Sequence, residues 1–166
     1  LRARGLRCTL EIVGPGDFEA SLAAYAHQLG VRDQVCVVGA LPPALVAEQM
    51  RAADIVCLPS MAEGLPVTLM EAMVVGTPVV ASGISGIPEL VEHGVTGLLV
   101  VPVRPDLLAD AWALLAGDVA LRARLAQAGA QRVRALHNLV GSAQALSALF
   151  CAAASRPATT DSAAAP

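Results

Sequence analysis

The sequence contains no lysine: all 11 of its basic residues are arginines, and with 14 acidic residues the net charge is −3. A domain that binds nucleic acid normally carries a cluster of basic side chains. Aromatic residues make up only 2% of the chain, too few for a base-stacking platform or a ring-lined surface for carbohydrate polymers. We therefore expect no nucleic-acid partner and no polymer-binding module.

Long apolar runs are also missing. The longest, near residues 95–103, is far shorter than the about 20 residues that a membrane-spanning helix needs. The charged residues at the N-terminus are not directly followed by an apolar stretch with a cleavage site, so we expect no signal peptide. The expectation is a cytoplasmic protein without a transmembrane segment.

The pairs and clusters of side chains that hold metal ions are lacking too. None of the four cysteines forms a CxxC pair, and the first three lie in apolar runs, where a thiol behaves as a small hydrophobic group. The three histidines are isolated and are expected on the surface. We expect buried or inert reduced thiols, no metal site and no cofactor. The residues are Cys8, Cys36, Cys57 and Cys151, and His27, His93 and His137.

What the chain does have is a regular alternation of short apolar runs and amphipathic segments. Strands without polar alternation, separated by single helices, predict a parallel sheet covered on both faces. Right-handed crossovers then give a Rossmann-like, doubly wound α/β layer, followed here by C-terminal helices. Strands are expected at 9–13, 35–38, 55–58, 78–81 and 97–101, with helices at 18–29, 43–52, 66–75, 88–91 and 105–116.

The domain count follows from length and composition. The 166 residues amount to about one domain, and 55% of them are hydrophobic, enough for a sizeable core. Residues 1–151 are expected to form that domain. Residues 152–166 are rich in Ala, Ser, Thr and Pro and too poor in large apolar groups to offset their ordering entropy, so a disordered tail is expected there.

The loop that follows the third expected strand has the densest pattern of functional residue types. Ligands of parallel sheets bind at the carboxyl ends of the strands. Gly64 lets the backbone come close to a ligand, and Pro66 suits the start of a helix whose free N–H groups favour a phosphate. Glu63 precedes this helix start, and Glu71 lies roughly 7 Å further along its axis. Their carboxylates suit vicinal hydroxyls, such as those of a ribose and a sugar.

The surrounding residues, SMAEGLPVTLMEAM at 60–73, resemble the EX7E signature of family-4 retaining glycosyltransferases with the GT-B fold. Further strings match the family in its own order, so the resemblance spans about residues 9–150. They are IVGPG at 12–16, LGVRDQV at 29–35, ADI at 53–55, GTPVVA at 76–81, GIPELV at 86–91 and GVTGLLV at 94–100.

The resemblance implies the donor-binding lobe of such an enzyme. Its donor substrate would be a nucleotide-diphosphate sugar, and a hexosyl group would pass to a carbohydrate, lipid or small-molecule acceptor. Carried over by position, Glu63 resembles the catalytic glutamate against the donor sugar, and Glu71 resembles the glutamate that binds the ribose. The remaining donor-binding positions implied are the turn Gly64, Leu65 and Pro66 and the base-holding region Gly39, Ala40 and Leu41.

The sequence also departs from the family. Members carry an Arg and a Lys that grip the diphosphate in the first strand–helix unit of the donor lobe, and the acceptor lobe precedes that unit. This chain has no lysine and resembles the family only from the second strand of the donor lobe onward. The resemblance therefore implies a truncated donor lobe, inactive by itself, whose N-terminal acceptor lobe and Arg/Lys pair lie upstream of Leu1.

Other interpretations stay open. A nucleotide-sugar epimerase or hydrolase of the same fold would share the donor site without a separate acceptor, and a non-catalytic nucleotide-sugar-binding module would keep only this lobe. Gly14 and Gly16 do not form a dinucleotide-binding fingerprint, since the third glycine position is Glu19. At Glu89, capping of a helix dipole and ligand binding compete evenly. The helical arginines 122, 124, 132 and 134 are expected on a solvated face.

Overall fold

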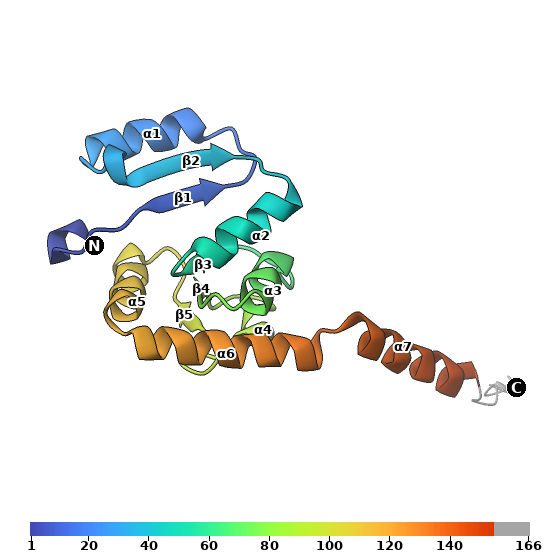
Figure 1. The fold of residues 1–166 in the computed structure, drawn as a ribbon. Helices are drawn as coiled ribbons and strands as arrows, with labels where there is room; N and C mark the ends of the chain where they lie inside the picture. The colour runs from blue at the N-terminus through green and yellow to red at the C-terminus, as the bar shows by residue number, and fades with distance from the viewer. Residues whose placement is uncertain (155–166) are drawn as a thin grey trace, which may run out of the picture.

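A computed structural model describes residues 1–154, apart from the side chains of Ala3 and Ala153. Strands and helices alternate along the chain (Figure 1), and every strand pair is parallel, so the expected α/β class is confirmed. The strands form two sheets, β1-β2 and β3-β4-β5. They are β1 (Leu10–Val13), β2 (Val35–Gly39), β3 (Val56–Leu58), β4 (Val79–Ser82) and β5 (Leu98–Val100).

The helices agree with the expected ranges to within one residue at each end. Proline at the first helical position starts two of them, because its fixed φ fits a helix and its missing N–H is not needed there. The elements are η1 (Arg2–Arg4), α1 (Glu19–Gln28), η2 (Arg32–Gln34), α2 (Pro43–Ala52), α3 (Val67–Val74), α4 (Ile87–Leu90), α5 (Pro105–Gly117), α6 (Val119–Leu136) and α7 (Leu139–Ala154).

The core surrounds β4, which is buried along its whole length. One face of this sheet packs on a cluster that includes Leu69 and Met73 of α3 and Ile87 of α4. The other face packs on a cluster with Leu115 of α5 and Leu125 of α6. Each fully buried side chain of this size contributes about 1.5–3 kcal/mol to stability. Helices on both faces of a parallel sheet are the arrangement that the apolar strands predicted.

The division into two sheets differs from the single sheet expected. β1 lies on the side of β2 that faces the three-stranded sheet (Figure 1), but within residues 1–154 it is not hydrogen-bonded to β3. The three residues of β3 are only half-buried, whereas its neighbour β4 is fully buried. The facing edges of β1 and β3 are therefore not covered in the way that an interior strand of a doubly wound sheet is covered.

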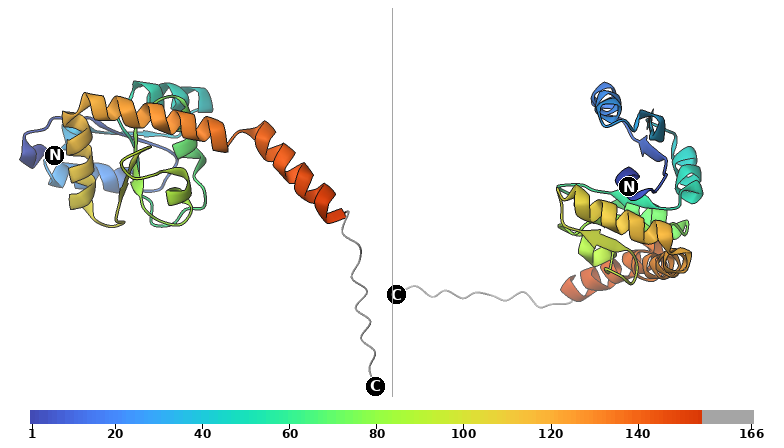
Figure 2. Two further views of the ribbon diagram at one scale, coloured as in Figure 1. Left: turned by 90° about the horizontal axis from the view of Figure 1, so that it is seen from below. Right: turned by 90° about the vertical axis from the view of Figure 1, so that its left-hand side faces the viewer.

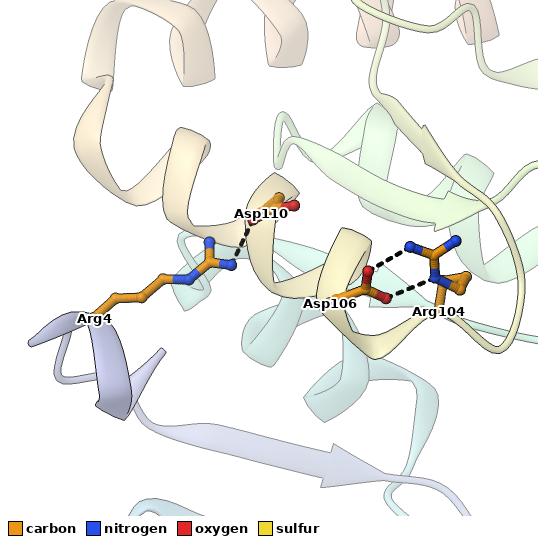
Figure 3. Close-up of polar contacts among 4 residues, drawn as sticks. All are labelled: Arg4, Arg104, Asp106 and Asp110. Atoms are coloured by element: carbon orange, nitrogen blue, oxygen red, sulfur yellow. Dashed lines mark hydrogen bonds and ion pairs between the residues drawn. The ribbon is translucent and has the colours of Figure 1, made fainter.

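The 3-10 helix η1 ties the two-stranded sheet to the rest of the chain. The Arg4 guanidinium forms an ion pair of 2.5 Å with Asp110 of α5 (Figure 3). Beside it, Arg104 donates from its Nε and one terminal guanidinium nitrogen to the two carboxylate oxygens of Asp106, at 2.8 and 2.5 Å, and this hydrogen bonding lowers the pKa of Asp106 to about 2. All four side chains are largely exposed, so these ion pairs contribute little to stability.

Two of the four helical arginines, Arg122 and Arg132, are partly buried, so the expected solvated face is wrong for them, whereas Arg124 and Arg134 are exposed as expected. Arg122 donates to the Leu115 carbonyl at 2.5 Å, Arg132 to Glu89 at 2.9 Å and Arg134 to Val74 at 3.1 Å. Each acceptor lies in the last turn of a helix, where carbonyls lack intrahelical partners. The arginines of α6 thus act as C-terminal caps for α5, α4 and α3.

The expected burial of the cysteines is wrong for Cys8 and Cys36, which are exposed. Cys8 precedes β1, and Cys36 lies on β2 in the two-stranded sheet, where helices cover less of the surface than they do around β4. Cys57 of β3 is half-buried, and burial raises the pKa of its thiol to about 11. Cys57 is therefore protonated and unreactive at neutral pH, as expected.

The last helix extends away from both sheets (Figure 1, Figure 2). α7 continues to Ala154, beyond the expected domain end at residue 151, and residues 155–166 of the expected tail lie outside the described residues. Its sixteen residues include no charged side chain, and several large apolar ones are exposed. These are Leu139, Val140, Leu146, Leu149 and Phe150.

Thr77 supplies the first testable prediction. Its hydroxyl, buried in the turn before β4, donates to the Met50 carbonyl in the last turn of α2 at 2.6 Å. Thr77→Val keeps the shape but leaves that carbonyl without its donor, so we expect the free energy of unfolding to fall by about 1–3 kcal/mol. Chemical denaturation measures it. Thr68→Val, at an exposed position of α3, is the control and should change stability by no more than about 0.5 kcal/mol. Equal effects of the two substitutions would contradict the role assigned to the Thr77 hydroxyl.

Candidate functional site

The carboxyl ends of β3 and β4 open into two loops that meet. Because the strands are parallel, the loop after Leu58 and the loop after Ser82 leave the sheet at the same edge. The two loops come into close contact at Gly64 and Gly86. This edge is where ligands of open parallel sheets bind. The expected site residues 63–66 therefore lie at the expected end of the sheet.

Glu63 is held within the first of these loops. Its Oε1 accepts a hydrogen bond of 2.7 Å from the hydroxyl of Ser60, and its side chain is half-buried. The neighbouring Gly64 and Leu65 are exposed, and space beside the Gly64 α-carbon is open. A ligand can therefore approach the backbone at Gly64 with the Glu63 carboxylate already oriented beside it.

The start of α3 carries the anion-binding features that the sequence predicted. Pro66 is the N-cap residue, buried and extended, and no side chain caps the helix. The Pro66 carbonyl accepts hydrogen bonds from the N–H groups of Leu69 and Met70. The N–H groups at the start of the helix, before Leu69, have no partner within the helix and are available to a ligand. Glu71 is exposed on α3, about 6 Å along the axis from Val67. Glu63 and Glu71 thus flank one helix start.

The residues expected to hold the base lie at the carboxyl end of β2, in the two-stranded sheet. Gly39 ends β2 with φ of 76°, and its carbonyl accepts the N–H of Gly14 from the end of β1. Ala40 is exposed and Leu41 is half-buried. These three residues belong to the two-stranded sheet, and no hydrogen bond within residues 1–154 joins them to the loop at Glu63. Their role in holding a base stays a prediction.

Sequence reasoning placed the loop after β4 at the ligand-binding end of the sheet but assigned no site residue to it. Ser85 has a φ of 48°, rare for a residue other than glycine, asparagine or aspartate, and such backbone strain clusters at functional sites. The hydroxyl of Ser82 is buried without a protein partner in the part of the chain described here. Neither feature has a sequence signal, because both arise from how two loops pack. In the sequence, Gly86 was noticed only as the first residue of the GIPELV string that resembles the family.

Two shallow hollows of 480 and 340 Å³ within the described residues lie away from Glu63, one between the end of α3 and α6, the other beside η2 and β2. The loop at Glu63 is an open surface that suits one wall of a cleft. Of the described residues, no three His, Cys, Asp or Glu side chains gather to hold a metal ion, and none of the described helices is long and apolar enough to span a bilayer.

Comparison with known proteins identifies the family. The family described as Glycosyl transferases group 1 matches residues 1–132. The chain therefore belongs to the glycosyl transferases group 1. Among curated proteins it is 31% identical over 150 residues to an alpha-D-kanosaminyltransferase of Streptomyces kanamyceticus, covering 90% of this chain and 39% of that protein. It is 36% identical over 140 residues to a D-inositol 3-phosphate glycosyltransferase of Corynebacterium glutamicum, covering 82% and 33%.

Solved structures agree with this assignment. The Anabaena protein Alr3699/HepE in complex with UDP superposes with a TM-score of 0.82 at 28% identity, covering 87% of this chain and 41% of that one. A second structure of the same protein, with UDP-glucose, gives a TM-score of 0.79. The chain thus spans between 33% and 41% of the length of these three proteins.

Proposed function

We propose that this chain is the donor-binding lobe of a retaining glycosyltransferase of the family-4 type, which uses a nucleotide-diphosphate sugar and transfers a hexosyl group. The observation that carries the proposal is the placement of Glu63 and Glu71 around the uncapped start of α3, at the carboxyl end of β3. Family membership supports it independently. Two carboxylates beside free helix N–H groups complement a ligand with hydroxyls at both ends and phosphate between them.

Each group has a separate task in this proposal. The N–H groups at the start of α3 and its dipole stabilise the diphosphate as its charge grows during departure. Glu71 accepts the ribose hydroxyls, and Glu63, oriented by Ser60, accepts those of the donor sugar. In a retaining reaction the acceptor attacks from the face that the diphosphate leaves, so the protein acts mainly by positioning and charge stabilisation. The proposal invokes no metal ion or cofactor.

Relatives suggest which ligands to try first. The Anabaena neighbour is solved with UDP and with UDP-glucose at 28% identity, which supports a uridine nucleotide as the first probe. We place the base at Gly39, Ala40 and Leu41, at the end of β2. The acceptor is a carbohydrate, lipid or small molecule held by a second, N-terminal lobe, because the loop at Glu63 offers only one wall for a cleft.

The separation of the two sheets supports an upstream part of the donor lobe. The observed order, β2-β1 followed by β3-β4-β5, equals the common doubly wound order 3-2-1-4-5-6 without its first strand. A parallel strand from a segment preceding Leu1 would pair with the open edges of β1 and β3 and cover the half-buried β3. The loop after that strand would lie beside Glu63 and would carry the Arg/Lys pair.

Product analysis tests the proposal and separates its alternatives. The protein extended upstream of Leu1 is incubated with UDP-glucose and candidate acceptors, and the products are identified by NMR. A glycoside with the donor's anomeric configuration supports a retaining transferase, whereas an inverted glycoside contradicts that assignment. Free sugar alone would indicate a hydrolase and an epimerised donor an epimerase. UDP-glucose binding without any turnover would indicate a binding module.

A further inference from the structure

The contact between Gly64 and Gly86 leaves no room for a side chain. A β-carbon placed on Gly86 would lie 2.5 Å from the Gly64 carbonyl oxygen and 3.2 Å from its carbonyl carbon. Both atoms belong to the backbone, so they cannot rotate away as the end of a side chain can. Gly86 has a φ of −78°, which any residue adopts. Glycine is therefore required here by space and not by conformation.

The two loops differ in how firmly they are held. Gly86 is the N-cap residue of α4, its carbonyl accepts the Glu89 N–H at 3.1 Å, and the next side chain, Ile87, is completely buried. Gly83 at the other end of this loop donates to the Val100 carbonyl of β5 at 2.8 Å. The loop at Gly64 is exposed by comparison. A side chain at Gly86 would therefore displace the loop at Gly64, with Glu63 in it, and leave α4 in place.

We infer that Gly86 is a positioning residue, which sets where the Glu63 carboxylate and the Gly64–Leu65 backbone lie against the nucleotide sugar. The inference rests on the proposed function and adds to it a residue that touches no substrate. The open space beside Gly64 and the filled space beside Gly86 give the two touching glycines opposite tasks. Gly64 leaves space for the ligand, and Gly86 determines the position of the backbone segment that contacts the ligand.

The test compares Gly86→Ala with Gly83→Ala in the 166-residue chain, with UDP as the probe. A β-carbon on Gly83 meets the Leu99 β-carbon at 3.6 Å, an ordinary contact, so this change in the same loop is the matched control. In Gly86→Ala we expect altered amide NMR shifts at residues 63–65 and UDP affinity about tenfold weaker, since a displaced backbone at Gly64 and Leu65 loses about one hydrogen bond to the charged diphosphate. Gly83→Ala should show neither effect.

Two further measurements keep a structural effect apart from a positioning effect. Thr77→Val, far from the loop at Glu63 in the turn before β4, lowers stability and should leave UDP affinity unchanged. In the wild-type chain UDP should shift the Gly86 amide together with Gly64 and Leu65, a readout that holds even if Gly86→Ala does not fold. A shift at Gly64 without one at Gly86 would overturn the inference.

The remaining outcomes distinguish failure of the positioning role from failure of the proposed site. Unchanged amides at residues 63–65 in Gly86→Ala, or altered amides with wild-type affinity, would overturn the positioning role while the proposed site stands. A wild-type chain whose residues 63–71 do not respond to UDP at any concentration would overturn the proposed site itself, and the inference with it.

Discussion

Glu71→Ala, introduced into the protein extended upstream of Leu1, should weaken binding of UDP by about 1–3 kcal/mol, or roughly 5- to 150-fold. The exposed carboxylate of Glu71 beside the start of α3 is the proposed acceptor for the ribose hydroxyls. Isothermal calorimetry measures the affinity. Glu48→Ala, an exposed glutamate on α2, is the control and should bind UDP as the wild type does.

Glu63→Ala in the same protein should act mainly on turnover. The carboxylate that Ser60 orients is proposed to meet the donor sugar and not the nucleotide, so UDP affinity should change little. The rate of transfer should fall by about 100-fold or more, the usual cost of losing a group that stabilises the reacting centre. Unchanged UDP affinity in Glu71→Ala together with unchanged turnover in Glu63→Ala would remove the site assignment.

The 166-residue chain by itself should transfer no sugar and should bind nucleotide sugars only weakly. The loop at Glu63 forms one wall of the proposed cleft, and closure against a second lobe is what orients the acceptor and excludes water. Without the Arg/Lys pair, the diphosphate meets only a helix start, worth about 0.3–1 kcal/mol for each charge interaction. Weak binding of this kind is still measurable by NMR titration.

The measurement is a product assay on the 166-residue chain with several nucleotide sugars, run beside the same assay on the protein extended upstream. Only the extended protein should give product. Hydrogen exchange adds a structural readout, because a strand inserted between β1 and β3 should slow exchange of their edge amides. Robust transfer by the 166-residue chain would require an acceptor site within it and would overturn the proposed truncation.

Local sequence determined the elements with good accuracy. α2 begins at Pro43 and ends at Ala52, as expected, because a proline at the first helical position and an apolar periodicity are both local signals. The position of Glu63 and Glu71 around the start of α3 followed in the same way, since Pro66 lies at that helix start. The loop that contains Glu63 could thus be predicted from neighbouring residues in the sequence.

Local sequence failed wherever the outcome depends on residues far apart in the chain. Arg132 and Arg134 look like surface cations on α6, yet they donate to carbonyls of α4 and α3 that lie 43 and 60 residues away in sequence. Cys36 stands in an apolar run typical of a buried strand, yet it is exposed. Burial of a strand is decided by the helices and strands that cover it, and an apolar run does not report whether they are present.

The sequence by itself determined the α/β class, the order of strands and helices and the loop with two glutamates, because these depend on periodicity, turn residues and spacing along the backbone. Only the tertiary structure decided that the strands form two sheets, that arginines of α6 cap other helices, and that Gly86 packs against Gly64. Each of these depends on which segments, distant in the sequence, lie beside one another in space, and close packing admits or excludes single atoms in ways that no local pattern encodes.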